Sequence, residues 1–520
     1  MKKLLASLLS ALLLAGLPAA ATAQDAWAPT IDQNQVIDYP EDNRLHIVEP
    51  NSDNNHTFLR FLTKDWETVC QEVGPNWDCG SGKQGKFYGY IILPICGEIV
   101  ENCIDGVNIY QDGQAPIAAE LQKTIAGAMF KGFPNRGIPS GGGVSIFRGS
   151  VEHSPGLSDY VVMAKIRATF EKTKTQIEQL EISVVPVRAK PEPLAKSPRF
   201  IESGCDNDFE NSSCVDAGLF PNNHLCVYQE DGVCGIAQEF AEGTRVGVKL
   251  KLSNQIAGWF KGRLEDPQLS VAKVDSRYSS VSIDAKPASI GRFYHESVPS
   301  KTGEPSAKDV LGYAPGTGFG LSRVEANRPD AFKVIKAYRS WVKDTASGVS
   351  TVWSVGSINK FDISRTGDPK GCFQDQSRLI GLVTTNATVF EQGAPVLRSG
   401  FLNYKVAGMH YLPDGVTEAL GSYDLVMRSD VARCLYGFSK APISASISIS
   451  GEGDKNIATT VVSEKNGWLK LAAYGFTFSE KTIKVKLTQK KTTITCVAPG
   501  KKAKKVTAVS PKCPKGFKRR

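Results

Sequence analysis

Alternation of apolar and polar residues is the dominant pattern along this chain of 520 residues. It is clearest over residues 160–170, 245–252 and 481–487. Successive side chains of a strand point to opposite faces, so such runs are typical of half-buried β-strands. The 48 glycines separate these runs, as turns between strands require. The pattern therefore predicts a mainly β protein with two or three antiparallel, sandwich-like domains.

Two segments instead show apolar residues at helical spacing behind a proline. Residues 116–130 carry Ile117, Leu121, Ile125 and Met129 at intervals of four. Residues 329–342 place Phe332, Ile335, Tyr338 and Val342 on one helical face. Proline is favoured in the first turn of a helix, so both segments are predicted to be helices packed against sheets.

Composition shifts divide the chain. Residues 188–198 are rich in proline and charge and read as a linker. The predicted parts are a first β domain (24–187), this linker, a second β domain (199–329), a helical connector (330–353), a β-sandwich (354–488) and a basic module (489–520). The first two domains share an order: a four-cysteine cluster, a glycine turn, then a long strand pair (160–170 with 179–187, and 245–252 with 268–274). Duplication and a chance likeness of antiparallel β domains both explain this order.

The first 23 residues read as a secretory signal. Lys2 and Lys3 precede an apolar run over residues 4–17, and Ala21 and Ala23 form a small-residue cleavage pattern, so the mature chain is expected to start near Gln24. No other stretch approaches about 18 unbroken apolar residues, which predicts no transmembrane anchor. We expect a secreted protein, extracellular or on the cell surface.

Twelve cysteines agree with export, because disulfides persist in oxidising compartments. They cluster as four, four, two and two: Cys70, Cys79, Cys96, Cys103, Cys205, Cys214, Cys226, Cys234, Cys372, Cys434, Cys496 and Cys513. Each four-cysteine cluster allows three connectivities, of which we favour nearest-neighbour pairing. The last four predict two bridges. Cys372–Cys434 would close a loop of roughly 60 residues, worth about 4 kcal/mol, and Cys496–Cys513 would staple the C-terminal segment for roughly 3 kcal/mol.

Charge is concentrated at the C-terminus. Residues 489–520 contain no acid and eleven basic residues: Lys490, Lys491, Lys501, Lys502, Lys504, Lys505, Lys512, Lys515, Lys518, Arg519 and Arg520. The whole chain has 62 basic and 53 acidic residues; without these eleven and without Lys2 and Lys3, 49 basic residues stand against the 53 acids. Such asymmetry indicates contact with an anionic partner. The segment is predicted to be a hairpin, with strands at 492–497 and 505–509 and a turn begun by Pro499 and Gly500.

The C-terminal third of the chain resembles a set of secreted actinobacterial proteins of uncharacterised function. The matching stretches are residues 402–410, 422–436 and 464–470, together with the tail segments 494–497, 504–507 and 511–514. The three tail segments resemble a terminal module, ITCV…KKVT…PKCP, that recurs on such proteins. The resemblance implies secretion and an actinobacterial source. It implies no activity, so no site residues carry over.

Motifs for catalysis are incomplete. Residues 80–87 nearly match the phosphate-binding pattern G-x4-G-K-[ST], but Phe87 stands where the Mg²⁺-binding hydroxyl is needed. The six histidines form no close ligand pair, and the cysteine spacings are too wide for zinc. A Ser-His-Asp site assembled from distant residues would use His410 as the most suitable base. We expect no cofactor and no metal, and no catalytic residue is assigned.

Two binding alternatives stay open. Acids alternate over residues 206–211 as in a calcium loop, but Asn211 replaces the glycine that such a loop needs, so a solvated turn is the simpler interpretation. Trp66, Trp77, Tyr88 and Tyr90 cluster in the first domain, where they serve either the core or a glycan platform.

Together these patterns predict a secreted surface protein with a structural or adhesive role rather than a catalytic one. Its basic module would dock to anionic cell-envelope polymers or glycans, losing affinity with salt. Export argues against nucleic acid as the partner. A secreted hydrolase with a non-contiguous site and a glycan-binding protein are the alternatives. The pattern does not indicate an oligomeric state.

Overall fold

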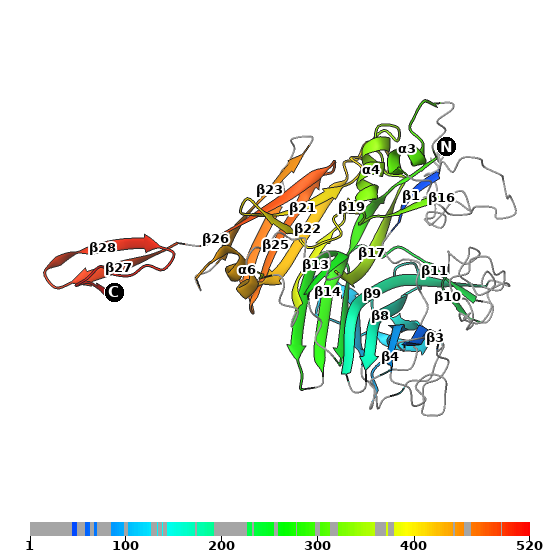
Figure 1. The fold of residues 1–520 in the computed structure, drawn as a ribbon, viewed down its shortest axis with the longest axis horizontal. Coiled ribbons are helices and arrows are strands. Elements are labelled where there is room, and N and C mark those ends of the chain that lie inside the picture. Colours follow the sequence, from blue (N-terminus) through cyan, green and yellow to red (C-terminus); the bar gives the residue numbers. More distant parts are fainter. Residues whose placement is uncertain are drawn as a thin grey trace, which may run out of the picture.

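The structure of the chain, a computed structural model, describes residues 44–48, 58–62, 67–69, 85–97, 102–125, 133, 138, 143–171, 174–191, 226–230, 233–253, 258–276, 278–296, 302–312, 321–358, 371–372, 379–439, 443–451, 459–489 and 491–520. Within these ranges most regular structure is β, as the alternation predicts (Figure 1). The described helices are short: α3 (Ala307–Leu311), α4 (Pro329–Tyr338) and α6 (Ser429–Tyr436).

One long run of hydrogen-bonded strands crosses the body of the molecule. Its order is β3–β2–β4–β8–β9–β17–β13–β18–β22–β25–β24. Neighbours are antiparallel except β13 and β18, which are parallel. The strands are β2 (Phe58–Leu62), β3 (Glu67–Val69), β4 (Lys86–Ile92), β8 (Asp159–Glu171), β9 (Lys174–Pro191), β13 (Gly258–Lys273), β17 (Gly348–Ser357), β18 (Leu379–Thr385), β22 (Leu420–Arg428), β24 (Thr459–Lys465) and β25 (Trp468–Thr477).

A second layer of four strands covers the first half of this run. Its order is β5–β12–β14–β13, all antiparallel, with β5 (Cys103–Gln111), β12 (Thr244–Leu252) and β14 (Ser279–Arg292). The two layers enclose one hydrophobic core, in which Ile166, Val248 and Ile283 are fully buried or nearly so. The alternating residues of each strand supply this core, as the sequence pattern predicts.

β13 belongs to both layers because it bends. Its first half pairs with β17 and β18, and its second half pairs with β14. The pairing with β14 shifts between Glu265 and Gln268, and Asp266 lies there with φ +52°. Such a bulge bends a strand and increases its twist, which lets one strand pass from one sheet to another.

A second sandwich follows. One layer is β18–β22–β25–β24, and the other is β19–β21–β26–β23, with β20 pairing with β21. The second layer comprises β19 (Val389–Phe390), β20 (Val396–Arg398), β21 (Phe401–Ala407), β23 (Ile443–Gly451) and β26 (Lys481–Gln489). The two layers enclose a second hydrophobic core, which includes Tyr404, Leu425, Leu471 and Val485. One face of α4 packs against the same core. The predicted sandwich is therefore present, and the predicted Cys372–Cys434 bridge is confirmed.

Two small sheets and two extensions of the long run complete the described structure. One small sheet is β15–β1–β16, and the other is the C-terminal hairpin described below. The extensions join β10 and β11 to β9, and β6 and β7 to β8. The strands are β1 (Arg44–Val48), β6 (Glu120–Thr124), β7 (Ser145–Arg148), β10 (Cys226–Glu230), β11 (Val233–Ala237), β15 (Tyr294–Glu296) and β16 (Leu321–Glu325).

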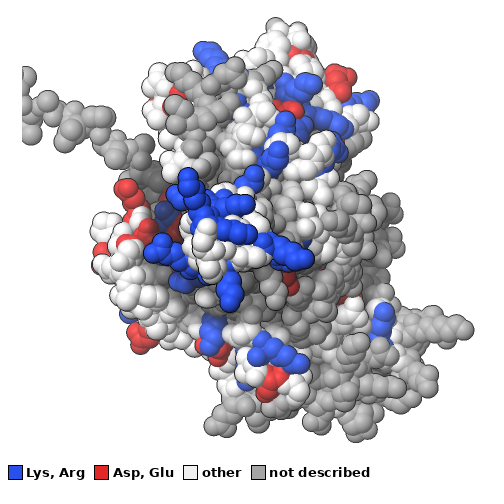
Figure 2. Space-filling view, turned by 90° about the vertical axis from the view of Figure 1, so that its left-hand side faces the viewer, with Lys and Arg blue, Asp and Glu red and all other residues white. Residues whose placement is uncertain are grey.

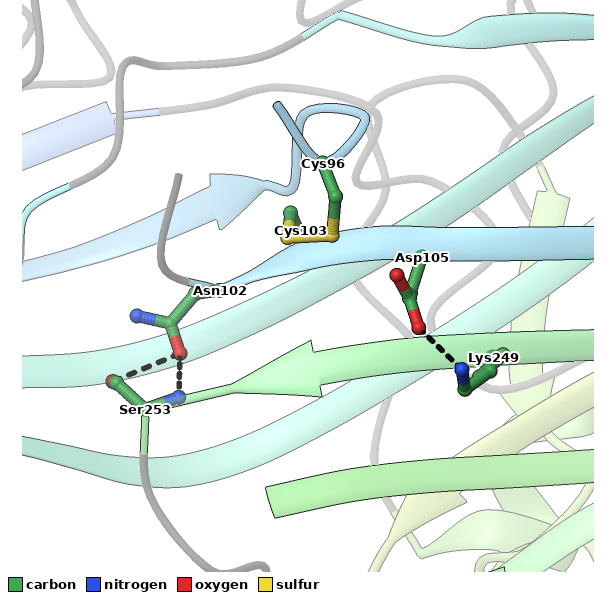
Figure 3. Close-up of a disulfide and its surroundings, with 6 residues drawn as sticks. All are labelled: Cys96, Asn102, Cys103, Asp105, Lys249 and Ser253. Carbon is green, nitrogen blue, oxygen red and sulfur yellow. Dashed lines mark hydrogen bonds and ion pairs between the residues drawn. A yellow bond between two sulfur atoms is a disulfide. The ribbon is translucent and has the colours of Figure 1, made fainter. Parts of the chain in front are cut away.

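The predicted bridge between Cys96 and Cys103 is confirmed and anchors the start of β5 (Figure 3). Beside it Asn102, with φ +60°, accepts hydrogen bonds from the backbone N–H (2.9 Å) and the hydroxyl (3.0 Å) of Ser253. Lys249 of β12 pairs with Asp105 of β5 at 2.6 Å. The disulfide end of β5 is therefore tied to β12, its neighbour in the sheet.

The predicted helix over residues 116–130 is wrong in the part that is described. Residues 120–124 form strand β6, which pairs with β7. Ile117 and Leu121 are 42% and 41% exposed, so they do not form the buried face of a packed helix. Residues four apart also lie on one face of a strand, so this spacing did not distinguish the two structures. The other predicted helix is confirmed as α4, which ends at Tyr338 rather than at residue 342.

Strand pairing departs from the sequence expectation at two further places. β8 and β9 pair as predicted, but β12 lies between β5 and β14, so residues 245–252 and 268–274 are not a strand pair. β9 continues through Pro191, so residues 188–191 are strand rather than linker. Strands also pair across the predicted domain boundaries, as β12 does with β5 and β13 with β18.

Several predictions lie outside the described residues. These are the signal over residues 1–23, the remaining linker, Cys70, Cys79, Cys205, Cys214, the side chains of Cys226 and Cys234, the acidic segment 206–211, Trp66 and Trp77.

Candidate polyanion-binding site

The C-terminal module is a three-stranded sheet held by one disulfide. β27 (Thr492–Ala498) lies between β28 (Lys501–Ala508) and the short β29 (Lys518–Arg519). Pro499 and Gly500 make the predicted turn, and Gly500 has φ +70°, which favours glycine. The Cys496–Cys513 bridge is confirmed and ties β27 to the segment that returns as β29. β28 begins at Lys501 rather than at residue 505, and β29 was not predicted.

Little of this module is apolar core. Ile494 and Cys496 are its buried residues, and Val506 stands opposite Ile494 in the pairing. Phe517 packs near two lysine side chains, with the ammonium of Lys504 5.0 Å and that of Lys501 5.9 Å from the ring centroid. So small a sheet is only marginally stable without a crosslink, so the disulfide is expected to stabilise it.

Every basic residue of the module that the structure describes is exposed. These ten are Lys491, Lys501, Lys502, Lys504, Lys505, Lys512, Lys515, Lys518, Arg519 and Arg520, whereas Lys490 lies outside the described residues. No Asp or Glu in the described parts of the chain forms an ion pair with any of them. Their mutual repulsion is therefore not balanced within the described structure.

Basic side chains project from both faces of the sheet. Lys504 and Arg519 stand opposite Cys496 on its two sides, so they share the face of the disulfide. Lys505 stands opposite Thr495, and Lys518 opposite Val497, so these two lie on the other face. That face also carries two threonine hydroxyls 2.7 Å apart, those of Thr493 and Thr507.

The module stands away from the body. In Figure 1 the hairpin projects beyond β26 at one end of the molecule, and Figure 2 shows its Lys and Arg side chains massed on that side, with a second group of basic side chains above them. Uncompensated exposed cations on a projecting support attract polyanions, and salt screens the attraction. The basic residues predicted from the sequence thus lie together on one small sheet that a disulfide crosslinks.

A second cluster of charges, not found from the sequence, lies where β13 bends. Arg245 of β12 is almost fully buried and contacts the carboxylates of Asp284 (2.5 Å), Asp266 (2.9 Å) and Asp112 (3.4 Å). It also donates to the backbone oxygen of Asp266 at 2.9 Å. Burial of the Tyr110 hydroxyl, which donates to Asp284, raises the pKa of Tyr110 to about 12.

Asp424 of β22 continues this network beneath the bulge. It is completely buried, accepts a hydrogen bond from the Tyr474 hydroxyl at 2.5 Å, and accepts another from the backbone N–H of Asp266 at 3.3 Å. Lys470 of β25 pairs with Asp266 and lies 3.9 Å from Asp424. Burial raises the pKa of Asp424 to about 7, against the opposing effect of Tyr474. Burial also raises the pKa of Asp266, but Lys470 and Arg245 outweigh it and hold that pKa below its usual value.

This network contains the residue types of an acid–base catalytic site, but a substrate could not reach its central carboxyl group. A general acid must reach the substrate proton within hydrogen-bond distance, directly or through one water. Asp424 has no exposed surface, and both of its oxygens already accept protein hydrogen bonds. The cluster therefore ties β22 and β25 to β12 and to the bend of β13. A signal for it exists in the sequence: Asp266 precedes Pro267 within a strand pattern, and Asp424 is a lone charge in an apolar run.

His410 is held by structural contacts. One ring nitrogen lies 3.0 Å from the backbone oxygen of Phe478, and the other lies 3.5 Å from the carboxylate of Glu418. Its backbone N–H donates to Asp344 at 2.9 Å. Among the described contacts of its ring none is to a serine hydroxyl, so the described structure does not assemble the Ser-His-Asp site considered above.

Of the aromatic cluster, Tyr88 and Tyr90 lie on β4 and are partly exposed. Their rings meet edge to face at 6.2 Å, and Arg167 donates to the Tyr90 hydroxyl at 3.2 Å. Burial, followed by the nearby Tyr90, raises the pKa of Tyr88 to about 12. The described pair is thus engaged with its own neighbours.

Comparisons with protein-family models, with curated proteins and with solved structures find no match to this chain. Among the described residues, no group of three or more His, Cys, Asp and Glu side chains is placed to hold a metal ion. No helix in the described ranges is long and apolar enough to cross a membrane.

Proposed function

We propose that this chain is a secreted surface protein that its C-terminal hairpin docks to anionic polymers of the cell envelope, where the body has a structural or interaction role. The observation that carries the proposal is the set of ten exposed cations on a disulfide-stapled hairpin, none of which pairs with an acidic side chain in the described ranges. The resemblance to secreted actinobacterial proteins supports the location. The disulfides support an oxidising compartment.

The hairpin suits this role because its cations are presented on a fixed scaffold. On one strand, side chains of the same face recur about every 6.6–6.8 Å, and neighbouring strands lie about 4.8 Å apart. A linear polyanion can therefore engage several cations at once, releasing its counterions as it binds. Such binding is strong at low salt and falls steeply as salt rises.

A charge-neutralised hairpin tests the proposal without removing the module. The variant carries Gln at Lys491, Lys502, Lys505 and Lys512, all exposed; a matched control carries Gln at exposed Lys190, Lys273, Lys336 and Lys465 of the body. Both lose four charges. Binding of the mature proteins to isolated cell envelopes is measured against salt. We expect the control to bind like the wild type and to be released by salt. We expect the hairpin variant to bind much more weakly, with a salt slope smaller by roughly three. Equal binding of the two variants would refute the docking role.

A further inference from the structure

We infer that the outer face of the sheet β21–β26–β23 is a second binding surface, and that its ligand is an anionic polysaccharide. The inference rests on the proposed docking role, because the polymer is the one that the hairpin holds. It adds the chemical class of that polymer and a site on the body.

The outer face is defined by the strand alternation. Along β26, residues 481, 483, 485 and 487 are buried, whereas residues 482, 484, 486 and 488 face outward. Along β23, Ala445, Ile447 and Ile449 pack on the core, which leaves Ser446, Ser448 and Ser450 exposed on the other face. Opposite residues of paired strands share a face, so these two sets and the outward residues of β21 form one surface.

Registered rows of polar groups cross this surface. Asn403, Lys484 and Ser448 stand side by side on the three strands, and Lys405, Thr482 and Ser450 form the next row. Ser446 lies opposite Lys486. The ammonium of Lys486 lies 5.5 Å from the centroid of the partly exposed Phe401 ring. The surface therefore combines hydroxyls, cations and one aromatic ring, whereas the amide NH2 of Asn403 already donates to backbone oxygens of neighbouring residues.

The cations at the centre of this surface have no acidic partner among the residues that the structure describes. No carboxylate in the described parts of the chain forms an ion pair with Lys484 or Lys486, whereas Lys405 at the margin pairs with Glu480 at 2.8 Å. Serine and threonine hydroxyls both donate and accept, as sugar hydroxyls do. An aromatic ring offers an apolar plane for the C–H face of a sugar. A polysaccharide bearing sulfate, phosphate or carboxylate groups meets all of these features, whereas a polyphosphate or an anionic lipid headgroup does not use the ring.

The position of the surface favours the same polymer that the hairpin binds. β26 carries Lys484 and Lys486 and ends at Gln489, and β27 of the hairpin begins at Thr492. Five residues of extended chain span about 17 Å, so Lys486 and Lys491 lie within that reach of each other. A polymer held at one site is therefore at high effective concentration at the other, which strengthens attachment without new contacts.

The test uses the full mature chain with its hairpin unchanged, and two probes: dextran sulfate, a sulfated glucan, and inorganic polyphosphate. The variants are Lys484→Gln with Lys486→Gln, and separately Phe401→Ala with Phe401→Tyr as the ring-preserving control. Lys190→Gln with Lys273→Gln is the charge-matched control, and the four-lysine hairpin variant is measured in parallel. Circular dichroism and thermal unfolding establish that each variant is folded.

We expect the Lys484/Lys486 variant to bind dextran sulfate at least fivefold more weakly than its control. Phe401→Ala should weaken dextran sulfate binding by a similar factor, leave polyphosphate binding unchanged, and be rescued by Phe401→Tyr. If the Lys484/Lys486 variant matches its control, the second surface is refuted, and hairpin docking stands if the hairpin variant has lost affinity. If the lysines matter but Phe401→Ala leaves dextran sulfate binding unchanged, the polysaccharide assignment is overturned. If only the hairpin variant is without effect, the proposed docking by the hairpin fails while the surface on the body survives.

Discussion

The C-terminal hairpin and the network around Arg245 are both clusters of charge, but they hold it in opposite ways. In the hairpin, ten cations are exposed, and none of them pairs with a carboxylate in the described part of the chain. Around Arg245, the two cations Arg245 and Lys470 face four carboxyl groups, and Arg245 and Asp424 are buried. The cations of the hairpin can therefore attract an external polyanion, whereas the charged groups of the network pair with one another inside the protein.

This contrast distinguishes charged groups that are available to bind a ligand from charged groups that stabilise the fold. Balanced, buried groups are costly to desolvate and are retained where each has a partner. Unbalanced exposed cations gain little for the fold, since surface charge contributes about 0–1 kcal/mol per pair at best. A charge cluster is thus a candidate binding site when it is exposed and one-signed, and the hairpin meets both conditions.

A large effect on stability is expected from removing the centre of the network. Arg245→Ala leaves Asp284, whose side chain is 19% exposed, without its cation, whereas Asp266 keeps Lys470. Breaking a fully buried pair costs about 3–5 kcal/mol, and the partial exposure of Asp284 lowers the expected loss to about 2–3 kcal/mol. Arg148→Ala is the matched control, because Arg148 pairs with Asp159 on the surface, where the side chains are 54% and 37% exposed. Its loss should stay below about 1 kcal/mol. Urea unfolding of both variants measures the difference, and equal losses would show that the network does not support the fold.

The next effect is local to the hairpin. Replacing Cys496 and Cys513 together by Ser removes a crosslink worth about 3 kcal/mol to a sheet with almost no core. We expect trypsin to cut the hairpin rapidly after Lys501 and Lys505 while the unfolding of the body is unchanged. Replacing Cys372 and Cys434 by Ser is the counterpart, expected to destabilise the body by about 4 kcal/mol and to leave the hairpin intact. A hairpin that resists trypsin without its bridge would contradict this view of the module.

The sequence predicts those elements whose pattern has one structural meaning. Strict alternation identified β8, β12 and β26, and the spacing of the last four cysteines identified two bridges. The intervals of four over residues 117–129 had two meanings, because a strand and a helix both align residues four apart, and there the helix prediction was wrong.

The candidate sites divide in the same way. The basic hairpin is contiguous, so its residues could be named from the sequence alone. The network joins Arg245 to Asp424 across nearly 180 residues of chain, and only the pairing of β13 with β18 and the packing against β22 bring them together. Lys484, Asn403 and Ser448 likewise meet only through strand register. Register between distant strands is set by the whole core, which a local pattern does not report.

The smallest effect concerns the titration of Asp424. Burial raises its pKa in the folded state to about 7, whereas an unfolded aspartate titrates near 3.9, so the folded state binds an extra proton between these values. This contribution to stability is fully present below about pH 4 and is lost as pH rises through 7. Asp424→Asn is uncharged at every pH, so relative to it the wild type should gain about 1–2 kcal/mol between pH 8 and pH 5.5. Urea unfolding of both proteins at the two pH values measures this change. A difference between them that is independent of pH would show that Asp424 is ionised throughout this pH range and that burial does not raise its pKa.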